Sequence, residues 1–331
     1  MPTALLWFRR DLRLGDHPAL LAACDAAGAD GDVLPVFVFD DRLWGPSGAP
    51  RRQFLLDCLT ELRSATDGAL VLRHGDPARV LPQMAAQAGA GSVHVSADTG
   101  PYGRRRDQSV ERALGDVPLV RTGSPYLVTP GRVTKRDGSP FQVFSPFARA
   151  WRDHGWRAPA PDPARLTWHR GARCDELPSA PDLGDVHLPP AGEAAAHAAW
   201  EQFRDDRLTG YAEGRNTPGT NGTSRLSAYL KYGCIHPRTL MADLAAQDGG
   251  EAVRRYTDEL AWRDFYADVL WHHPGSARQY LNPQLQAWPT TPARTPRSWS
   301  RPGSGAAPAF PSWTPACASC SARRTCTTGC G

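Results

Sequence analysis

Two segments in the second half of the chain decide its fold: Gly222-Thr-Ser-Arg-Leu-Ser-Ala-Tyr-Leu230 and Asp258-Glu-Leu-Ala-Trp-Arg-Asp-Phe-Tyr266. Thr223 and Ser224 are good helix caps, and apolar residues follow them at helical spacing. The second segment continues to Leu270 with apolar side chains that form one broad helical face. From residue 193 onward the sequence therefore predicts a helical region.

In the first segment, hydroxyl groups, free N–H groups and Arg225 lie together at an expected helix start. Such a start is a ready site for a phosphate or diphosphate, although any soluble helix can begin in this way. In the second segment, Glu259 and Arg263 stand four residues apart, which predicts a surface ion pair. Trp262, taken alone, is equally consistent with an ordinary core tryptophan.

The first 130 residues alternate between apolar strands and helices. Strands are expected at 4–8, 33–39, 69–73, 92–96 and 117–128, and helices at 18–28, 51–65 and 77–88. This alternation predicts an α/β fold with a doubly wound parallel sheet. A ligand crevice is expected at the carboxyl edge of this sheet, where the strands are followed by Arg9, Asp40, Asp41, His74, Asp76 and Asp98.

By pattern the chain divides into four segments. Residues 1–130 form the α/β region and residues 193–288 the helical region. Between them, residues 131–192 form a linker in which a helical stretch at 141–156 precedes a proline-rich run. Residues 289–331 have no periodicity, and their composition is typical of a disordered tail.

The two opening segments, in this order and with this spacing, resemble the DNA photolyase/cryptochrome family. The start of the chain, Leu6-Trp-Phe-Arg-Arg-Asp-Leu-Arg-Leu14 followed by Asp16-His17, is similar to the family's opening. The chain is most like the bacterial cyclobutane pyrimidine dimer photolyases, and the resemblance ends near Trp288. It implies an α/β domain for an antenna chromophore, followed by an all-α domain that binds FAD and DNA and is here incomplete.

Carried over position by position, the resemblance implies three groups of site residues. The implied FAD contacts are Tyr211, Thr223, Ser224, Arg225, Leu226, Ser227 and Tyr256. The implied DNA contacts are Arg215, Glu259, Trp262, Arg263 and Tyr266, of which Glu259 and Trp262 meet the lesion as the catalytic residues. Trp288 matches the surface end of the family's tryptophan electron path. Asp258 stands where an amide is common in the family.

The activity implied by the resemblance is light-driven, FAD-dependent repair of pyrimidine dimers in damaged DNA, a carbon–carbon lyase reaction. Excited, reduced FAD gives an electron to the dimer, which splits and returns it. The family's antenna is a folate or a deazaflavin. The folate type carries an Asn-Glu pair before a short basic run, whereas this chain reads Tyr102-Gly-Arg-Arg-Arg-Asp107 without that carboxylate. A deazaflavin is therefore preferred to a folate.

The last fifteen residues contain four cysteines whose spacing suggests a zinc site: Cys317, Cys320, Cys326 and Cys330. A frameshift at or just after Trp288 gives another interpretation. Shifted forward by two bases, the codons for residues 310–320 permit Phe-Pro-Ile-Val-Asp-Ala-Gly-Met-Arg-Gln-Leu, a later motif of the family. We therefore interpret the tail as out of frame, predict no metal site, and expect weak flavin binding and impaired activity.

The net charge of +4 neither demands nor excludes a nucleic-acid partner. The chain has no apolar run of transmembrane length, and its start passes directly into a strand without a leader. A cytoplasmic monomer without membrane association is therefore expected. Its scattered cysteines are expected to be reduced: Cys24, Cys58, Cys174 and Cys234.

Two other functions stay open. One is a cryptochrome-like blue-light photoreceptor, which signals and cleaves no dimer. The other is an inactive remnant in which only the α/β domain folds. Light-dependent cleavage of a dimer separates the first from repair, and a stable proteolytic fragment near residues 1–190 would indicate the second.

Overall fold

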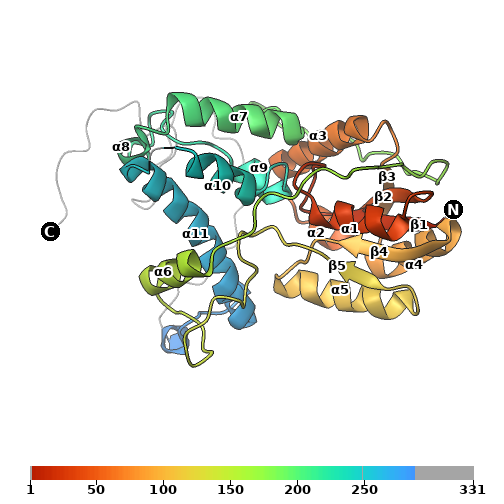
Figure 1. Cartoon of the computed structure of the whole chain (residues 1–331), viewed down its shortest axis with the longest axis horizontal. Helices are drawn as coiled ribbons and strands as arrows, with labels where there is room; N and C mark the ends of the chain where they lie inside the picture. Colours follow the sequence, from red (N-terminus) through yellow and green to blue (C-terminus); the bar gives the residue numbers. More distant parts are fainter. Residues whose placement is uncertain (1, 248, 288–331) are drawn as a thin grey trace, which may run out of the picture.

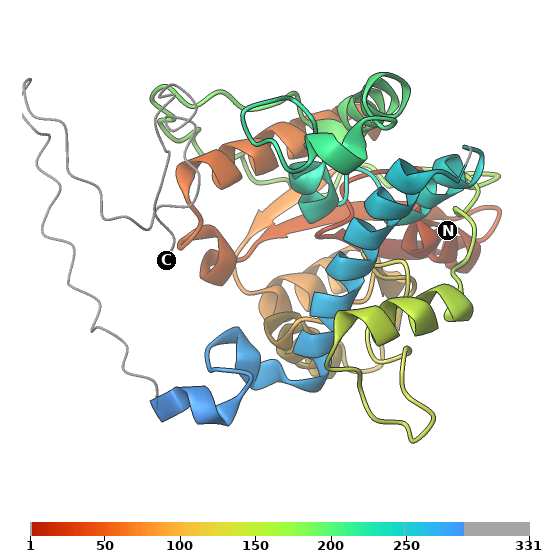
Figure 2. The ribbon, with the colours of Figure 1, turned by 90° about the vertical axis from the view of Figure 1, so that its left-hand side faces the viewer.

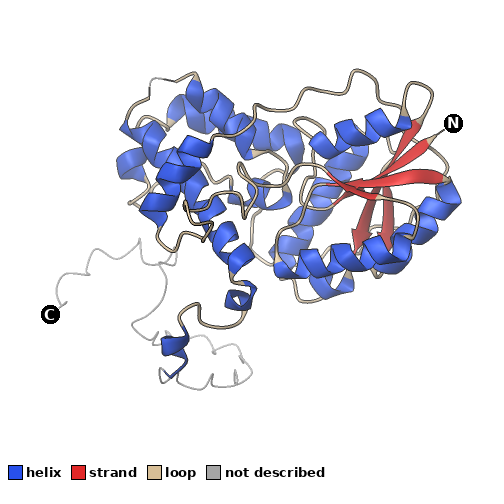
Figure 3. Ribbon diagram, turned by 60° about the horizontal axis from the view of Figure 1, so that its bottom comes forward, coloured by secondary structure: helices blue, strands red, loops and turns tan. Residues whose placement is uncertain are grey.

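The computed structural model describes residues 2–247 and 249–287. An α/β region lies at one end of the molecule and a helical region at the other (Figures 1 and 3). Trp288, the four cysteines near the end of the chain and the predicted frameshift lie outside the described residues. In the part of the chain that is described, no helix has both the length and the apolar character that a membrane crossing requires.

A five-stranded parallel sheet forms the centre of the α/β region. Its order is β3-β2-β1-β4-β5, and all of its pairs are parallel. The strands are β1 (Thr3–Phe8), β2 (Asp32–Phe39), β3 (Val71–His74), β4 (Ala90–Val95) and β5 (Leu119–Arg121). The predicted doubly wound sheet is confirmed. The final strand, however, is much shorter than the predicted 117–128, because the chain turns at Gly123, where φ is 78°.

Helices cover both faces of the sheet (Figure 3). On one face, α1 (Pro18–Ala27) and α3 (Ala49–Ala65) pack in a core with side chains such as Leu6 and Phe8 of β1. On the other face, α4 (Pro77–Ala88) and α5 (Pro101–Leu114) pack with Leu5 and Trp7. This alternation follows from the strand geometry, in which successive side chains point to opposite faces. A short helix, α2 (Asp41–Trp44), follows β2.

The chain then crosses to the helical region. After α6 (Phe144–His154), a segment without helices runs back along the sheet, where Trp168 forms an isolated parallel bridge with Val33 of β2. The remaining helices are α7 (Gly192–Asp206), α8 (Tyr211–Gly214), α9 (Ser227–Tyr232), α10 (Pro237–Ala245), α11 (Glu251–His272), and the 3-10 helices η1 (Pro274–Ala277) and η2 (Pro283–Ala287).

One hydrophobic core extends through both regions. It contains the α1 and α3 side of the sheet together with buried residues of the later helices, such as Trp200 of α7, Tyr229 of α9 and Leu260 of α11. Helix α3 contacts α7 directly, far from it in sequence. The helical region therefore covers one layer of the α/β region and shares its apolar interior.

Gly233 lies where the two regions approach each other closely. It ends α9 in the left-handed conformation, with φ at 70°. A Cβ atom placed there would lie 2.0 Å from the carbonyl oxygen of Arg10, which follows β1. The Tyr232 carbonyl accepts a hydrogen bond from the Leu12 amide at 3.0 Å, and the Gly233 carbonyl accepts one from Arg13 at 3.0 Å. Only glycine satisfies both the dihedral angle and the contact.

We expect Gly233→Ala to lower the free energy of unfolding by about 2–4 kcal/mol, because it adds a steric clash to the strain of a positive φ. Gly138→Ala is the matched control, since Gly138 also has a positive φ of 79° but nothing lies within 4 Å of an added Cβ. The control should cost about 1 kcal/mol. Urea unfolding followed by circular dichroism measures both. Equal losses would contradict the tight contact at Gly233.

Candidate functional site

An aromatic stack joins α6 and α11, which pack side by side (Figure 2). The rings of Trp262 and Phe144 are nearly parallel, with 3.7 Å between centroids and 7° between planes. One turn further along α11, the ring of Tyr266 lies 5.4 Å from that of Trp262, and Tyr266 is 64% exposed. Trp262 is thus neither a fully buried core residue nor a free one, and the stack brings flat apolar rings to the surface.

An open hollow of about 580 Å³ lies beside this stack and is lined by residues of α6, α8 and α11. Arg215, which follows α8, and Glu259 of α11 form an ion pair in its wall, with 2.7 Å between Nη2 and Oε1. Both side chains are about one third exposed, at 31% and 38%. The structure therefore brings Arg215, Glu259 and Trp262, all three predicted as DNA contacts, to one hollow.

The predicted ion pair between Glu259 and Arg263 does not form. Glu259 pairs with Arg215 instead, and Arg263 turns toward the segment after β5 and toward α9. Its guanidinium donates to the carbonyl oxygens of Pro125 at 2.6 Å and Leu230 at 3.2 Å, and burial lowers its pKa. Arg263 is not among the residues that line the hollow, so a direct contact of this residue with DNA stays a prediction.

The predicted capping of a helix by Thr223 and Ser224 is wrong. Helix α9 begins at Ser227, and its N-cap is Leu226, which makes no capping bond through its side chain. The cause is Arg225, which lies between Ser224 and the N-cap Leu226. Its positive φ of 53° turns the chain before the helix starts. The segment before α9 is therefore a loop that presents its own polar groups.

This loop lies against a buried aromatic cluster. The hydroxyl of Tyr256 donates to Oγ of Ser224 at 3.0 Å, and the rings of Tyr256 and Tyr211 meet edge to face at 5.1 Å. Burial raises the pKa of Tyr256, which keeps its hydroxyl protonated as a donor. The loop also carries the polar side chains of Thr223 and Arg225, and α9 begins with Ser227. Hydroxyls and a guanidinium suit a diphosphate, so this donor set fits the FAD that the resemblance implies.

Two carboxylates whose structural role was not predicted from the sequence hold α11 in place. Asp264 accepts hydrogen bonds from the backbone amide of Val128 at 2.9 Å and from the indole of Trp151 in α6 at 3.0 Å. Asp268 accepts one from the amide of Gly131 at 2.7 Å. Both lie on one side of α11, four residues apart, and this spacing is the signal that could have revealed them. They fix both helices of the stack.

We expect Asp264 to make stability depend on pH. Burial raises its pKa from 3.8 to about 6. Because the pKa in the folded chain is above the ordinary value, the stability that Asp264 contributes is fully present below pH 3.8 and is lost as the pH rises through 6. The free energy of unfolding of the natural chain minus that of Asp264→Asn should thus fall by about 2–3 kcal/mol over this interval.

Urea unfolding between about pH 4 and pH 7 measures this difference. The control is Asp205→Asn, because Asp205 has a side chain that is 61% exposed beside Arg204. For the control variant the difference from the natural chain should stay constant. A constant difference for Asp264→Asn as well would show that its carboxyl group has no raised pKa.

A second cavity, of about 210 Å³, lies at the carboxyl edge of the sheet and confirms the predicted crevice. Arg9, Asp40 and Asp98 line it together, although they follow three different strands. Its aromatic lining comes from Trp7, Phe37, Phe39, Trp44 and Tyr232, and its further basic lining from Arg10, Arg51, Arg52, Arg106 and Lys231. Three of the residues predicted there do not line the cavity: Asp41, His74 and Asp76. The ring of His74 stacks on that of Phe39 at 4.7 Å.

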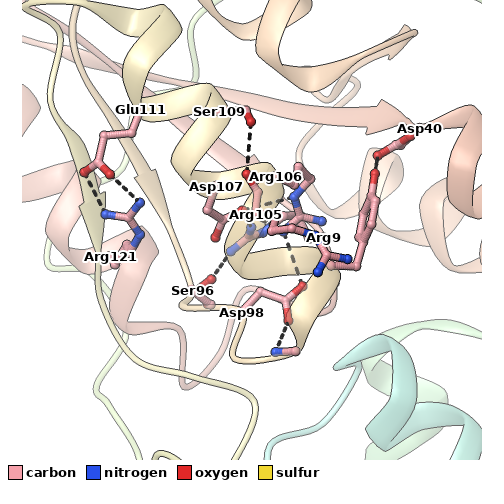
Figure 4. A network of polar contacts seen from close by, with 12 residues as sticks. Arg9, Asp40, Ser96, Asp98, Arg105, Arg106, Asp107, Ser109, Glu111 and Arg121 are labelled. Carbon is pink, nitrogen blue, oxygen red and sulfur yellow. Dashed lines mark hydrogen bonds and ion pairs between the residues drawn. The ribbon is translucent and has the colours of Figure 1, made fainter. Parts of the chain in front are cut away.

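Part of the basic run at the start of α5 takes part in a buried network of ion pairs (Figure 4). Asp107 accepts from Arg9 at 2.6 Å and from Arg106 at 2.8 Å, and Arg106 also pairs with Asp98 at 3.3 Å. The hydroxyl of Tyr102 donates to Asp40. Both carboxylates of the crevice thus have partners. The remaining cations give the crevice an excess of positive charge, which fits a ligand with an aromatic ring and an anionic group.

Residues 4–164 match the family model described as DNA photolyase. A deoxyribodipyrimidine photo-lyase of Thermus thermophilus is 38% identical over 87% of this chain and 65% of its own length. The enzyme of that name from Halobacterium salinarum is 35% identical over 86% of this chain and 67% of its own. The crystal structure of a class III photolyase from Agrobacterium tumefaciens has a TM-score of 0.80 at 29% identity, over 88% of this chain and 64% of that one. The chain thus spans about two thirds of the length of these relatives.

Proposed function

The chain belongs to the DNA photolyase family, and we propose that it serves light-driven repair of cyclobutane pyrimidine dimers in DNA, the deoxyribodipyrimidine photo-lyase reaction. One observation carries this proposal: the stack of Trp262 on Phe144 stands beside the Arg215–Glu259 ion pair at one open hollow. An aromatic platform next to paired charges suits a base that has left the DNA stack.

Trp262 is the packing surface for the dimer. A pyrimidine dimer is poorly stacked within DNA, so its extrusion costs less than that of an ordinary base, and photolyases are themselves a known example of base-flipping enzymes. The indole is held flat by Phe144 and by α6, which Asp264 anchors through Trp151. A rigid platform of this kind loses little side-chain entropy when the base packs on it.

Glu259 and Arg215 supply the polar contacts. The carboxylate of Glu259 can accept hydrogen bonds from the base edges of the dimer, while Arg215 is placed to contact a backbone phosphate. In the free chain the two neutralise each other at 2.7 Å. DNA binding then exchanges a partly exposed ion pair, which contributes little to stability, for contacts to the substrate. Asp258 also lines the hollow, where its carboxylate pairs with Arg152 of α6.

For the flavin, we propose that Thr223 and Arg225 of the loop and Ser227 at the start of α9 hold the diphosphate. Tyr256 and Tyr211 support this loop. When bound, a reduced flavin supplies the electron that splits the dimer and receives it back. The chain's own residues position the loop. The positive φ of Arg225 turns the chain within it, and the hydrogen bond from Tyr256 to Ser224 holds it against the aromatic cluster.

We expect Trp262→Ala to weaken binding of a duplex with one thymine dimer at least about fivefold, because base–aromatic stacking is worth about 1–3 kcal/mol. Trp262→Phe should keep most of the affinity. Fluorescence anisotropy in the dark measures binding of damaged and undamaged duplexes. With reduced FAD added and blue light applied, chromatography then measures how many dimers are cleaved. In Trp262→Ala this number should decrease together with the affinity for damaged DNA.

Tyr280→Ala is the matched control, because Tyr280 is 46% exposed and is not among the residues that line the hollow. It should bind damaged DNA like the natural chain. The proposed lesion site would be refuted if damaged and undamaged duplexes bound equally well and Trp262→Ala had no effect on binding. Tight binding without light-dependent cleavage would instead favour a cryptochrome-like photoreceptor.

For the α/β region, residues 1–130, we propose an antenna chromophore in the crevice, with a deazaflavin preferred to a folate. Two observations support the preference. The basic run at Tyr102–Asp107 lacks the carboxylate of the folate type, and Tyr102 and Arg106 are already engaged by Asp40 and Asp98. Flat aromatic rings and uncompensated cations line the cavity that remains.

Trp44→Ala should weaken deazaflavin binding about tenfold through the loss of one ring from the crevice wall. Quenching of the chromophore's fluorescence during titration measures the affinity, and a reduced folate titrated in the same way should bind at least about tenfold more weakly. Val186→Ala, at an exposed residue outside the crevice, is the control. Tighter binding of the folate would reverse the assignment.

A further inference from the structure

Two buried cysteines meet at the contact between the α/β region and the helical region. Cys58 lies in the middle of α3, and Cys234 follows α9, 176 positions later in the chain. Their sulfur atoms are 3.5 Å apart, and both side chains are completely buried. These two and the distant Cys24 and Cys174 are all free thiols. Neither Cys58 nor Cys234 belongs to the proposed repair site or to the crevice.

Tight packing on both sides holds this pair together. Phe54 of α3 contacts the rings of Tyr229 and Tyr232 of α9, with centroids 5.6 and 5.7 Å apart. The hydroxyl of Tyr232 donates to a backbone carbonyl of α3 at 2.8 Å. The amide of Cys234 donates to the Tyr229 carbonyl at 2.9 Å. A disulfide bond needs the sulfurs about 1.5 Å closer than they are.

We propose that Cys58 and Cys234 form a reversible disulfide, which links α3 covalently to the segment after α9, when the chain meets a peroxide. The thiol of Cys234 loses its proton, the thiolate attacks one oxygen of hydrogen peroxide, and the O–O bond breaks. The leaving hydroxide takes up that proton, so a sulfenic acid and one water result. The sulfur of Cys58 then attacks that of Cys234, its proton leaves with the hydroxyl group as a second water, and the S–S bond forms. Two thiols are oxidised by two electrons, and one peroxide is reduced.

We assign the first step to Cys234, because the contact between the thiols shifts their pKa values in opposite directions. That contact lowers the pKa of Cys234 and raises the pKa of Cys58. Cys234 is therefore the sulfur that becomes a thiolate first, and the thiolate is the nucleophile. Because both sulfurs are buried, the peroxide reaches them only during a local opening of the contact, so the reaction is slower than that of an exposed thiol.

The link has a direct structural effect. It closes a loop that contains most of the described chain, from α3 through the linker to α9. Long closed loops restrict the unfolded chain strongly, so the oxidised chain should be more stable than the reduced one. The bond also holds the helical region against the sheet.

The test treats the reduced, full-length chain with hydrogen peroxide, blocks free thiols with N-ethylmaleimide in denaturant, and digests with trypsin without a reductant. The expected product is a linked pair of peptides, residues 53–63 and 232–238, with two hydrogen atoms fewer than the separate peptides. Mass spectrometry identifies it and distinguishes it from products of the cysteines near the end of the chain. Dithiothreitol should separate the pair again.

Thermal unfolding gives the second readout. Peroxide should raise the Tm of the natural chain by about 5–10 °C. Cys174→Ser is the matched control and should show the same rise, whereas Cys58→Ser and Cys234→Ser should show none. The proposal is overturned if Cys58 and Cys234 carry N-ethylmaleimide after treatment that oxidises Cys174. It is also overturned if either residue is linked to a different cysteine or oxidised to a sulfinic acid.

Discussion

The arrangement of the whole molecule depends on the buried carboxylate of Asp16. It pairs with the guanidinium of Arg238 at the start of α10, at 2.6 Å, and accepts from the amide of Ala160 in the linker at 2.7 Å. The carbonyl of Asp16 accepts from Arg13 at 2.7 Å. Three distant segments thus meet at one residue that is 8% exposed. Removing one partner would leave a buried charge uncompensated, at a cost of about 3–5 kcal/mol.

Helix α11 converts this fixed arrangement into a site. One side of the helix carries Asp264 and Asp268, which bind backbone amides of the segment after β5. Another side carries Glu259 and Trp262 beside the hollow. Because the same helix carries the anchoring carboxylates and the residues beside the hollow, the position of the aromatic stack depends on contacts made away from the hollow. The hydrogen bonds of Asp264 and Asp268 therefore stabilise the geometry of the proposed repair site.

Regular patterns were predictable from the sequence, and long-range polar contacts were not. The first four strands and most helices follow from apolar periodicity, because strand and helix spacing is a local property. Helix α5 escaped prediction because two of its inward positions are Arg106 and Asp107, whose partners Arg9 and Asp98 lie elsewhere in the chain. The residues of the hollow were anticipated only through family resemblance. The pairing of Glu259 with Arg215 rather than Arg263 could not be predicted from the sequence, since α8 and α11 are separated along the chain and come into contact only when it folds.

The core on the α1 and α3 side of the sheet runs through both regions and determines how the molecule can unfold. The α1 and α3 layer is buried by helices of the second region, among them α7 with Trp200 and Phe203. Detaching those helices would expose a broad apolar face in water, which is unfavourable and promotes association between molecules. The boundary between sheet and helices is thus a poor place to divide the chain. Heat or denaturant should melt both regions in one cooperative transition, with no half-folded species accumulating between them.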